Sequence, residues 1–194
     1  MARPRELDET TAVEGAMNAF WAHGYEATST QDLCEATGLG RSSIYNTFGS
    51  KRELFRRTLA HYTGQGLATR SAVLEAPGTA VDRIAALLDA VIDDELSHDR
   101  RGCLMVNTAA ELGTPDDEVG TLVKADSEAH LGLLTDCVRL GVLDGSIDPD
   151  RNPADIAEFV HGTVASLRLM SRRGAGRKAM EAVADIAVSA VTAH

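Results

Sequence analysis

The side chains best suited to chemistry gather in one short segment, residues 41–57, where basic and hydrogen-bonding residues are interleaved. This segment contains five Lys or Arg and one acid, whereas residues 6–40 contain seven acids and no Lys or Arg. Contact with a phosphate backbone requires cationic side chains, and reading of base edges requires hydrogen-bond donors and acceptors. The segment therefore predicts a nucleic-acid contact. The first part of it is a run without any acid: Arg41, Ser42, Ser43, Ile44, Tyr45, Asn46 and Thr47.

The charge of the whole chain points the other way. The 194 residues carry a formal net charge of -10 at pH 7, which taken alone argues against a nucleic-acid binder. Residues 1–70, however, hold eight basic and eight acidic residues, so the whole excess of acid belongs to the rest of the chain. Such an asymmetry indicates different partners for the two parts.

Apolar residues recur along the chain at the i, i+3, i+4, i+7 spacing of amphipathic helices, and no strand-like alternation is present. Ser, Thr or Asn residues mark helix starts, and glycines such as Gly38, Gly49 and Gly141 mark helix ends. We therefore expect an all-α fold with about nine helices. The predicted helices are 8–23, 30–37, 41–48, 51–74, 80–98, 103–112, 115–140, 153–172 and 177–192.

The two short helices, 30–37 and 41–48, are joined by a tight turn that contains two glycines. The second helix then keeps one face exposed, as a helix that enters the major groove must. Lys51 follows at the start of the next helix, where free backbone N–H groups can bind a phosphate. The small core that holds the two helices on helix 8–23 is expected to contain Leu33, Leu39, Ile44 and Phe48.

A set of residues in the first 55 positions occurs in a recognisable register: Phe20, Gly24, Tyr25, Thr28, Ser29, Leu33, Ala36, Gly38, Leu39, Ile44, Tyr45, Phe48, Ser50, Lys51, Leu54 and Phe55. This register resembles that of the TetR family of bacterial transcription regulators. One departure is Gly40, where the family more often has Ser or Thr to cap the recognition helix, at a cost of up to about 1 kcal/mol. Another is a modest N-terminal arm with only Arg3 and Arg5.

The resemblance implies a three-helix helix-turn-helix DNA-binding domain, residues 1–50, followed by a helical ligand-binding and dimerisation domain, residues 51–194. A dimer would present two recognition helices to a pseudo-palindromic operator. The positions expected to contact DNA are Ser29, Thr30, Arg41, Ser42, Ser43, Tyr45, Asn46 and Lys51. Tyr45 either contacts a base or packs its ring against the first helix and offers only its hydroxyl to a phosphate. Arg56 and Arg57 are expected to be solvated.

The same resemblance implies that the middle helices enclose a ligand pocket and that the last two helices, within residues 153–192, pair with a second subunit. Broad apolar faces on these two helices agree with a four-helix interface. Asp126 and His130 lie four residues apart, so they either pair inside a pocket or flank the core and face water. Helical facing selects these pocket residues: Tyr62, Leu88, Ile92, Met105, Ala109, His130, Leu134, Cys137 and His161.

Cys103 is predicted to begin a helix directly after Arg100, Arg101 and Gly102. The helix dipole and the guanidinium charges would both favour the reactive thiolate. The Gly-Cys-Leu pattern, with Glu111 further on, also resembles a branch of the family that includes electrophile and oxidant sensors. A small buried thiol that only fills space is the alternative interpretation.

Other classes of protein are disfavoured. The sequence offers no glycine-rich phosphate loop, no metal-ligand cluster and no Ser-His-Asp signature, so we expect neither an enzyme nor a cofactor. No apolar run approaches the roughly 18 residues of a membrane span, no signal peptide is evident, and three separated cysteines fit a reducing cytoplasm. We expect a cytoplasmic, ligand-released repressor. The alternatives are thiol-based sensing through Cys103 and an activator without a ligand.

Overall fold

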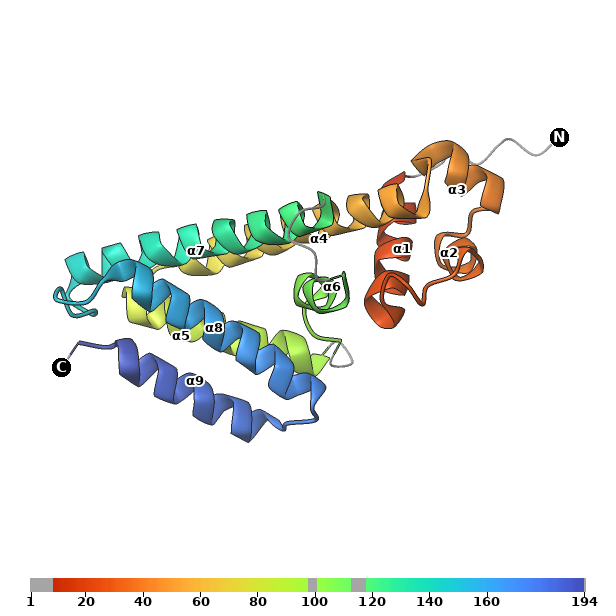
Figure 1. The fold of residues 1–194 in the computed structure, drawn as a ribbon. Helices are drawn as coiled ribbons and strands as arrows, with labels where there is room; N and C mark the ends of the chain where they lie inside the picture. Colours follow the sequence, from red (N-terminus) through yellow and green to blue (C-terminus); the bar gives the residue numbers. More distant parts are fainter. Residues whose placement is uncertain (1–8, 98–100, 113–117, 194) are drawn as a thin grey trace.

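The computed structural model describes residues 9–97, 101–112 and 118–193, and regular structure within these ranges is entirely α-helical (Figure 1). The expectations about Arg3, Arg5, Arg100 and the first residues of helix 115–140 lie outside the described residues. The predicted all-α fold and the number of helices in these ranges are confirmed. The helices are α1 (Glu9–His23), α2 (Thr30–Thr37), α3 (Arg41–Phe48), α4 (Lys51–Leu74), α5 (Ala80–Ser97), α6 (Leu104–Leu112), α7 (Glu118–Asp144), α8 (Pro153–Arg172) and α9 (Arg177–Val191).

The helix starts follow the predicted capping chemistry. At α2 the Ser29 hydroxyl accepts a hydrogen bond from the Asp32 N–H, and the Asp32 carboxylate accepts one from the Ser29 N–H, at 3.2 and 2.7 Å. This is a complete capping box, which satisfies two N–H groups that the first helical turn leaves free. At α3 the N-cap Gly40 makes no side-chain cap, as its lack of a side chain predicts.

The predicted end of the seventh helix near Gly141 was wrong, because α7 continues to Asp144. Gly141 allows Ala80 and Ile147 to pack closely against α7, because a Cβ at this position would lie only 2.7 Å from the Ala80 Cβ and from the Ile147 Cδ1. The chain leaves the helix at Gly145, whose φ of 80° lies in the left-handed region that favours glycine. A glycine inside a helix and a glycine at its end look alike in the sequence.

Two hydrophobic clusters make up the interior. The first joins α1, α2 and α3 to the beginning of α4 and to residues around the start of α6, and it contains the predicted core residues Leu33, Ile44 and Phe48, with Leu39 packed against it. The second lies among α5, α7, α8 and α9 and includes the end of α4. The long helix α4 therefore has one end in each cluster and connects them mechanically.

Figure 1 shows the consequence for the shape of the molecule. Helices α1, α2 and α3 form a small head at one end, and α4 and α7 run side by side away from it. Helices α5, α8 and α9 form the opposite end. Helix α6 lies at the junction between the head and the rest. Within the described residues, no helix combines the length and the apolar character needed to cross a membrane.

Candidate nucleic-acid interface

The exposed face of α3 is the part of the head that can enter a groove of DNA. Ile44 and Phe48 of this helix are buried in the head, which turns the remaining residues outward. The residues that this orientation leaves exposed are Arg41, Ser42, Ser43, Tyr45 and Asn46. They are one cation and four hydrogen-bonding side chains, which suits the major groove.

Tyr45 joins the two short helices. Its hydroxyl lies 3.2 Å from the Thr30 hydroxyl at the start of α2, and the Arg41 guanidinium lies 5.9 Å from its ring centroid. The side chain is 36% exposed. The Tyr45 hydroxyl is therefore directed toward the N-terminus of α2, and whether the ring contacts a base stays a prediction.

Lys51 is tied to the loop between α1 and α2. Its ammonium group donates to the Glu26 carbonyl oxygen over 3.4 Å and lies 4.6 Å from the ring centroid of Tyr25. The same loop leads directly into the Ser29 cap. Ser29, Thr30 and Lys51 are thus held by one short stretch of backbone, so a shift of this loop would move all three predicted contacts together.

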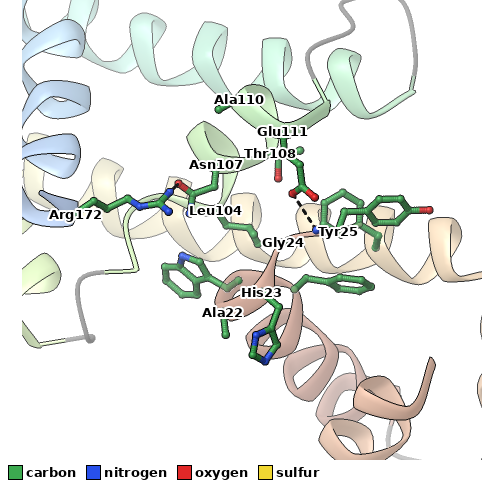
Figure 2. A pocket seen from close by; sticks show the side chains of 13 residues that line it. Ala22, His23, Gly24, Tyr25, Leu104, Asn107, Thr108, Ala110, Glu111 and Arg172 are labelled. Atoms are coloured by element: carbon green, nitrogen blue, oxygen red, sulfur yellow. Dashed lines mark hydrogen bonds between the residues drawn. The ribbon is translucent and has the colours of Figure 1, made fainter. Parts of the chain in front are cut away.

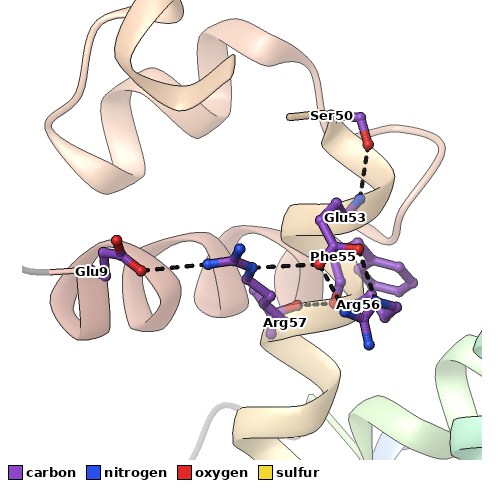
Figure 3. Close-up of polar contacts among 7 residues, drawn as sticks. Glu9, Ser50, Glu53, Phe55, Arg56 and Arg57 are labelled. Atoms are coloured by element: carbon purple, nitrogen blue, oxygen red, sulfur yellow. Dashed lines mark hydrogen bonds and ion pairs between the residues drawn. The ribbon is translucent and has the colours of Figure 1, made fainter. Parts of the chain in front are cut away.

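Arg56 and Arg57, expected to be solvated, keep 40% of each side chain exposed and also form ion pairs within the head (Figure 3). Arg56 makes two hydrogen bonds of 2.8 Å to the Glu53 carboxylate, and Arg57 reaches both Glu53 and Glu9. Hydrogen bonds from the Arg56 guanidinium lower the pKa of Glu53 to about 2. The Ser50 hydroxyl still caps the Glu53 N–H at 3.0 Å. The positive charge of Arg56 and Arg57 is therefore partly neutralised.

A cavity of about 340 Å³ separates the end of α1 from α6 (Figure 2). Aromatic side chains of the head line one part, and polar residues of α6 and α8 line the other. Glu111 of α6 stands at its border, and its carboxylate accepts hydrogen bonds from the backbone N–H groups of Tyr25 and Glu26, at 2.9 and 2.8 Å. Prediction from the sequence missed this contact, although the motif that contains Cys103 also contains Glu111.

A polar network crosses the interior of the C-terminal part. Arg70 of α4 donates to Asp126 of α7 over 2.6 Å, with both side chains largely buried. One helical turn further along α7, the Nδ1 of His130 lies 3.0 Å from the Nδ1 of His161 on α8. The two residues were expected either to pair with each other or to face water. The structure contradicts both expectations, because Asp126 and His130 bind different partners and His130 is only 2% exposed.

The other predicted pocket residues divide between two places. Leu88, Ile92, Leu134 and Cys137 are buried in the C-terminal cluster. Tyr62 and Met105 belong to the cluster of the head and the start of α6. Ala109 is exposed on α6, so its predicted inward orientation was wrong. The role of the remaining residues in binding a ligand stays a prediction.

Cys103 lies one residue before α6 and is 3% exposed. The Tyr62 hydroxyl donates to its Sγ over 3.6 Å. Burial, followed by the charge of Cys103, raises the pKa of Tyr62, which keeps this hydroxyl a donor. Arg101 turns away from the thiol: its guanidinium lies 4.6 Å from the Trp21 ring centroid and donates to Asn18. The proposed role of Cys103 stays a prediction.

The chain matches two family models that together span the head and the C-terminal part. A model described as bacterial regulatory proteins of the TetR family matches residues 12–58. A second, described as a tetracyclin repressor-like C-terminal domain, matches residues 80–187, which is more than half of the chain. The chain belongs to the TetR family of bacterial regulatory proteins, as its first 55 residues predicted.

Individual relatives agree with this assignment over nearly the whole length. The HTH-type transcriptional repressor ComR of Escherichia coli (strain K12) is 29% identical over 184 residues, which cover 94% of this chain and 88% of ComR. The repressor DhaR of Mycobacterium sp. (strain GP1) is 30% identical over 76% of this chain and 74% of DhaR. A cysteine mutant of the TetR family regulator CifR, solved with 26-bp operator DNA, is 34% identical, with a TM-score of 0.86 over 98% of this chain and 100% of CifR. The chain is a DNA-binding transcriptional regulator.

Proposed function

We propose that this regulator is a one-component repressor, in which a homodimer binds a pseudo-palindromic operator and a small molecule in the C-terminal part releases it. The observation that supports the proposal is the exposed face of α3, which presents Arg41 and hydrogen-bonding side chains and no acid. ComR and DhaR are named repressors, and CifR is bound to operator DNA. In this proposal residues 1–50 read DNA, residues 51–194 regulate, and the protein acts in the bacterial cytoplasm by binding and not by catalysis.

The proposed contacts follow from the position of each side chain. Ser42, Ser43 and Asn46 point away from the buried face of α3 and read base edges in the major groove. Arg41 and Lys51 neutralise phosphates, and the first turn of α2, with Ser29 and Thr30, offers hydroxyl and N–H donors to a phosphate on the flank of the same groove. Such backbone contacts set the orientation in which the base-reading residues of α3 operate.

Exposed apolar stripes on α8 and α9 support the dimer. On α8, Phe159 and Leu169 are 46% and 58% exposed, and the residues between them on the same face, Gly162 and Ser166, are small and exposed. On α9, Ile186 is 69% exposed, and Ala182 and Ala190, one helical turn before and after it, are exposed as well. Small residues allow close approach of helices, and apolar ones gain free energy from burial. A second copy of the chain is the partner that covers both stripes.

Release by a ligand requires that the ligand bind the DNA-incompetent state more tightly than the DNA-competent one. The buried residues proposed to line its site include His130 and His161, whose network connects α7 and α8. Among the described residues the Nε2 of His130 has no hydrogen-bond partner. A buried polar atom of this kind is costly unless a partner satisfies it, so a ligand with a hydrogen-bonding group at this position is favoured.

The test is selection of a duplex from a random DNA pool, followed by fluorescence anisotropy at several salt concentrations. We expect a two-fold symmetric site. If the selection yields no bound sequence even at low salt, DNA binding is refuted. Lys51→Ala should weaken binding and reduce the slope of log K against log salt by about 2 for a dimer, one phosphate per head. Tyr45→Ala should weaken binding while the dimer persists. Dissociation into monomers would make Tyr45 structural instead, and Tyr45→Phe separates the hydroxyl from the ring.

A second candidate function uses Cys103 as the sensor, and its position at the base of the junction favours it. The neighbouring Gly102 carbonyl accepts a hydrogen bond from the Trp21 indole over 2.8 Å, so a modified thiol would disturb a contact with the head. An α,β-unsaturated carbonyl would add its β-carbon to the sulfur, and the thiol proton would be transferred to the α-carbon. Cys103→Ser should abolish release by such a compound, and an unchanged response would eliminate this candidate.

A further inference from the structure

The head is attached to the C-terminal part by more than the continuous helix α4. Helix α4 holds the head through the packing of α1 on its beginning, and contacts outside α4 limit the bending and twisting that this packing still allows. A second attachment lies at α6: Gly102, just before this helix, contacts Trp21 of α1, and Glu111 near the end of the helix contacts the loop that follows α1 (Figure 2). Two separated points of contact restrict rotation where one does not.

At the beginning of α6 the contact is a side-chain one. The Trp21 indole of α1 donates to the Gly102 carbonyl, and the Arg101 guanidinium covers the Trp21 ring and donates to Asn18 over 3.1 Å. At the end of α6 the contact is with the backbone of the head. Both oxygens of Glu111 accept from the successive N–H groups of Tyr25 and Glu26.

The backbone of the head is shaped to receive this carboxylate. Gly24 has a φ of 84°, and a Cβ added to it would lie 2.8 Å from a carboxylate oxygen of Glu111. Glycine is therefore needed at this position for its conformation and for the close approach of Glu111. Successive N–H groups that point the same way bind an anion well, and hydrogen bonds to an ionised carboxylate are stronger than neutral ones.

The loop that Glu111 holds is directly connected to two of the predicted DNA contacts, Lys51 and Ser29. The Glu26 N–H donates a hydrogen bond to the Glu111 carboxylate, and the Glu26 carbonyl oxygen accepts one from the Lys51 ammonium group. The next residues lead into the Ser29 cap of α2. A movement of the end of α6 would therefore reach the start of α2 and Lys51, the first residue of α4, through this loop and not along the length of α4.

We propose that Glu111 is a positioning residue that sets the orientation of the DNA-reading head relative to the C-terminal part, and hence the half-site spacing that the dimer accepts. Its carboxylate links α6 to the loop between α1 and α2. This inference rests on the proposed binding of an operator by two heads. A defined orientation in each subunit determines the distance and the rotation between the two α3 helices, and these must match the helical repeat of DNA.

The test uses the full-length protein, the selected operator, and duplexes in which the half-sites are moved apart or together by 1 or 2 bp, which is roughly 35° or 70° of helical rotation. We expect Glu111→Ala to reduce the preference for the native spacing at least threefold, with binding to a single half-site unchanged within twofold. Glu111→Gln should fall between, because one of the two acceptor oxygens is replaced by an NH₂ group that cannot accept from the second N–H. Glu128→Ala is the matched control, since Glu128 is exposed on α7 and pairs with Lys124 of the same helix.

Several outcomes separate the explanations. A wild-type spacing preference in Glu111→Ala would overturn the proposal. An equal loss on the half-site and on every spacing would also overturn it, because Glu111 would then only stabilise the head. Glu111 is exposed, so we expect a folded variant with unchanged thermal unfolding; if Glu111→Ala does not fold, Glu111→Gln decides. Failure of the wild-type protein to bind any operator would instead refute the proposed function.

Discussion

The buried imidazole of His130 should make the stability of the fold sensitive to mild acid. Burial, followed by the charge of Arg70, lowers the pKa of His130 to about 3, whereas an unfolded chain has a histidine pKa of about 6.5. Between these two values the unfolded state binds a proton that the folded state does not. The free energy of unfolding therefore falls as the pH is lowered through this window, and no such loss is expected above about pH 7.

The magnitude follows from the width of the window. Each pH unit below the unfolded pKa costs about 1.4 kcal/mol for one group, so His130 alone should cost about 1.4 kcal/mol at pH 5.5, one unit below that pKa. Burial likewise lowers the pKa of His161, which adds in the same direction. The range from pH 7.5 to 5.5 is chosen because ordinary carboxylates stay ionised in it.

The assay is urea unfolding across this pH range at one fixed protein concentration, because association affects the apparent stability of a dimer. His130→Leu should give a shallower dependence on pH than the wild-type protein, by about the amount assigned to His130. The comparison uses the slope and not the absolute stability, since the substitution also removes the contact with His161. Equal slopes in the two proteins would refute the assignment of the buried neutral imidazole.

Three further predictions test the packing of the rest of the molecule. Gly141→Ala should destabilise the protein by about 1–3 kcal/mol in urea unfolding, because its Cβ would overlap with Ala80 and Ile147; an unchanged midpoint would show that α7 shifts freely. Ile186→Asp should convert the dimer to monomers in sedimentation experiments, because a charge would enter the apolar stripe of α9; a persistent dimer would place the interface elsewhere. Ser29→Ala should cost about 1 kcal/mol through loss of the α2 cap, measured by thermal unfolding, and an equal loss in Asp32→Ala would support the reciprocal box.

The helices, their caps and the location of the basic segment could be predicted because they depend on neighbours in the sequence. The Ser29 and Asp32 capping box lies within one turn, and the burial of Leu33, Ile44 and Phe48 follows from helical spacing alone. Capping and helical spacing are therefore sufficient to predict each helix before any contact between helices is known. The family register of the first 55 residues has the same origin, since each of its positions serves the local geometry of the head.

Contacts between distant parts of the chain were not predicted in the same way. The ion pair between Arg57 and Glu9 was not predicted, because Glu9 lies far away in the sequence and comes within reach only once α1 packs on α4. Asp126 and His130, four residues apart on one helix, were considered as a pair. In the structure Asp126 binds Arg70 of α4, and His130 contacts His161 of α8. Which side chains meet across two helices depends on the angle and register at which the helices cross, and helical periodicity does not encode either.

Glu111 shows the division most clearly. The sequence predicted that Glu111 lies near the end of a helix, in the same motif as Cys103, because both features depend on local spacing alone. Its role depends on the approach of α6 to the loop after α1, on the left-handed turn at Gly24 and on the space that a glycine leaves there. Only the tertiary structure decided that a carboxylate of the C-terminal part holds the backbone of the DNA-reading head, because the two segments meet through packing and not through the local preferences of either.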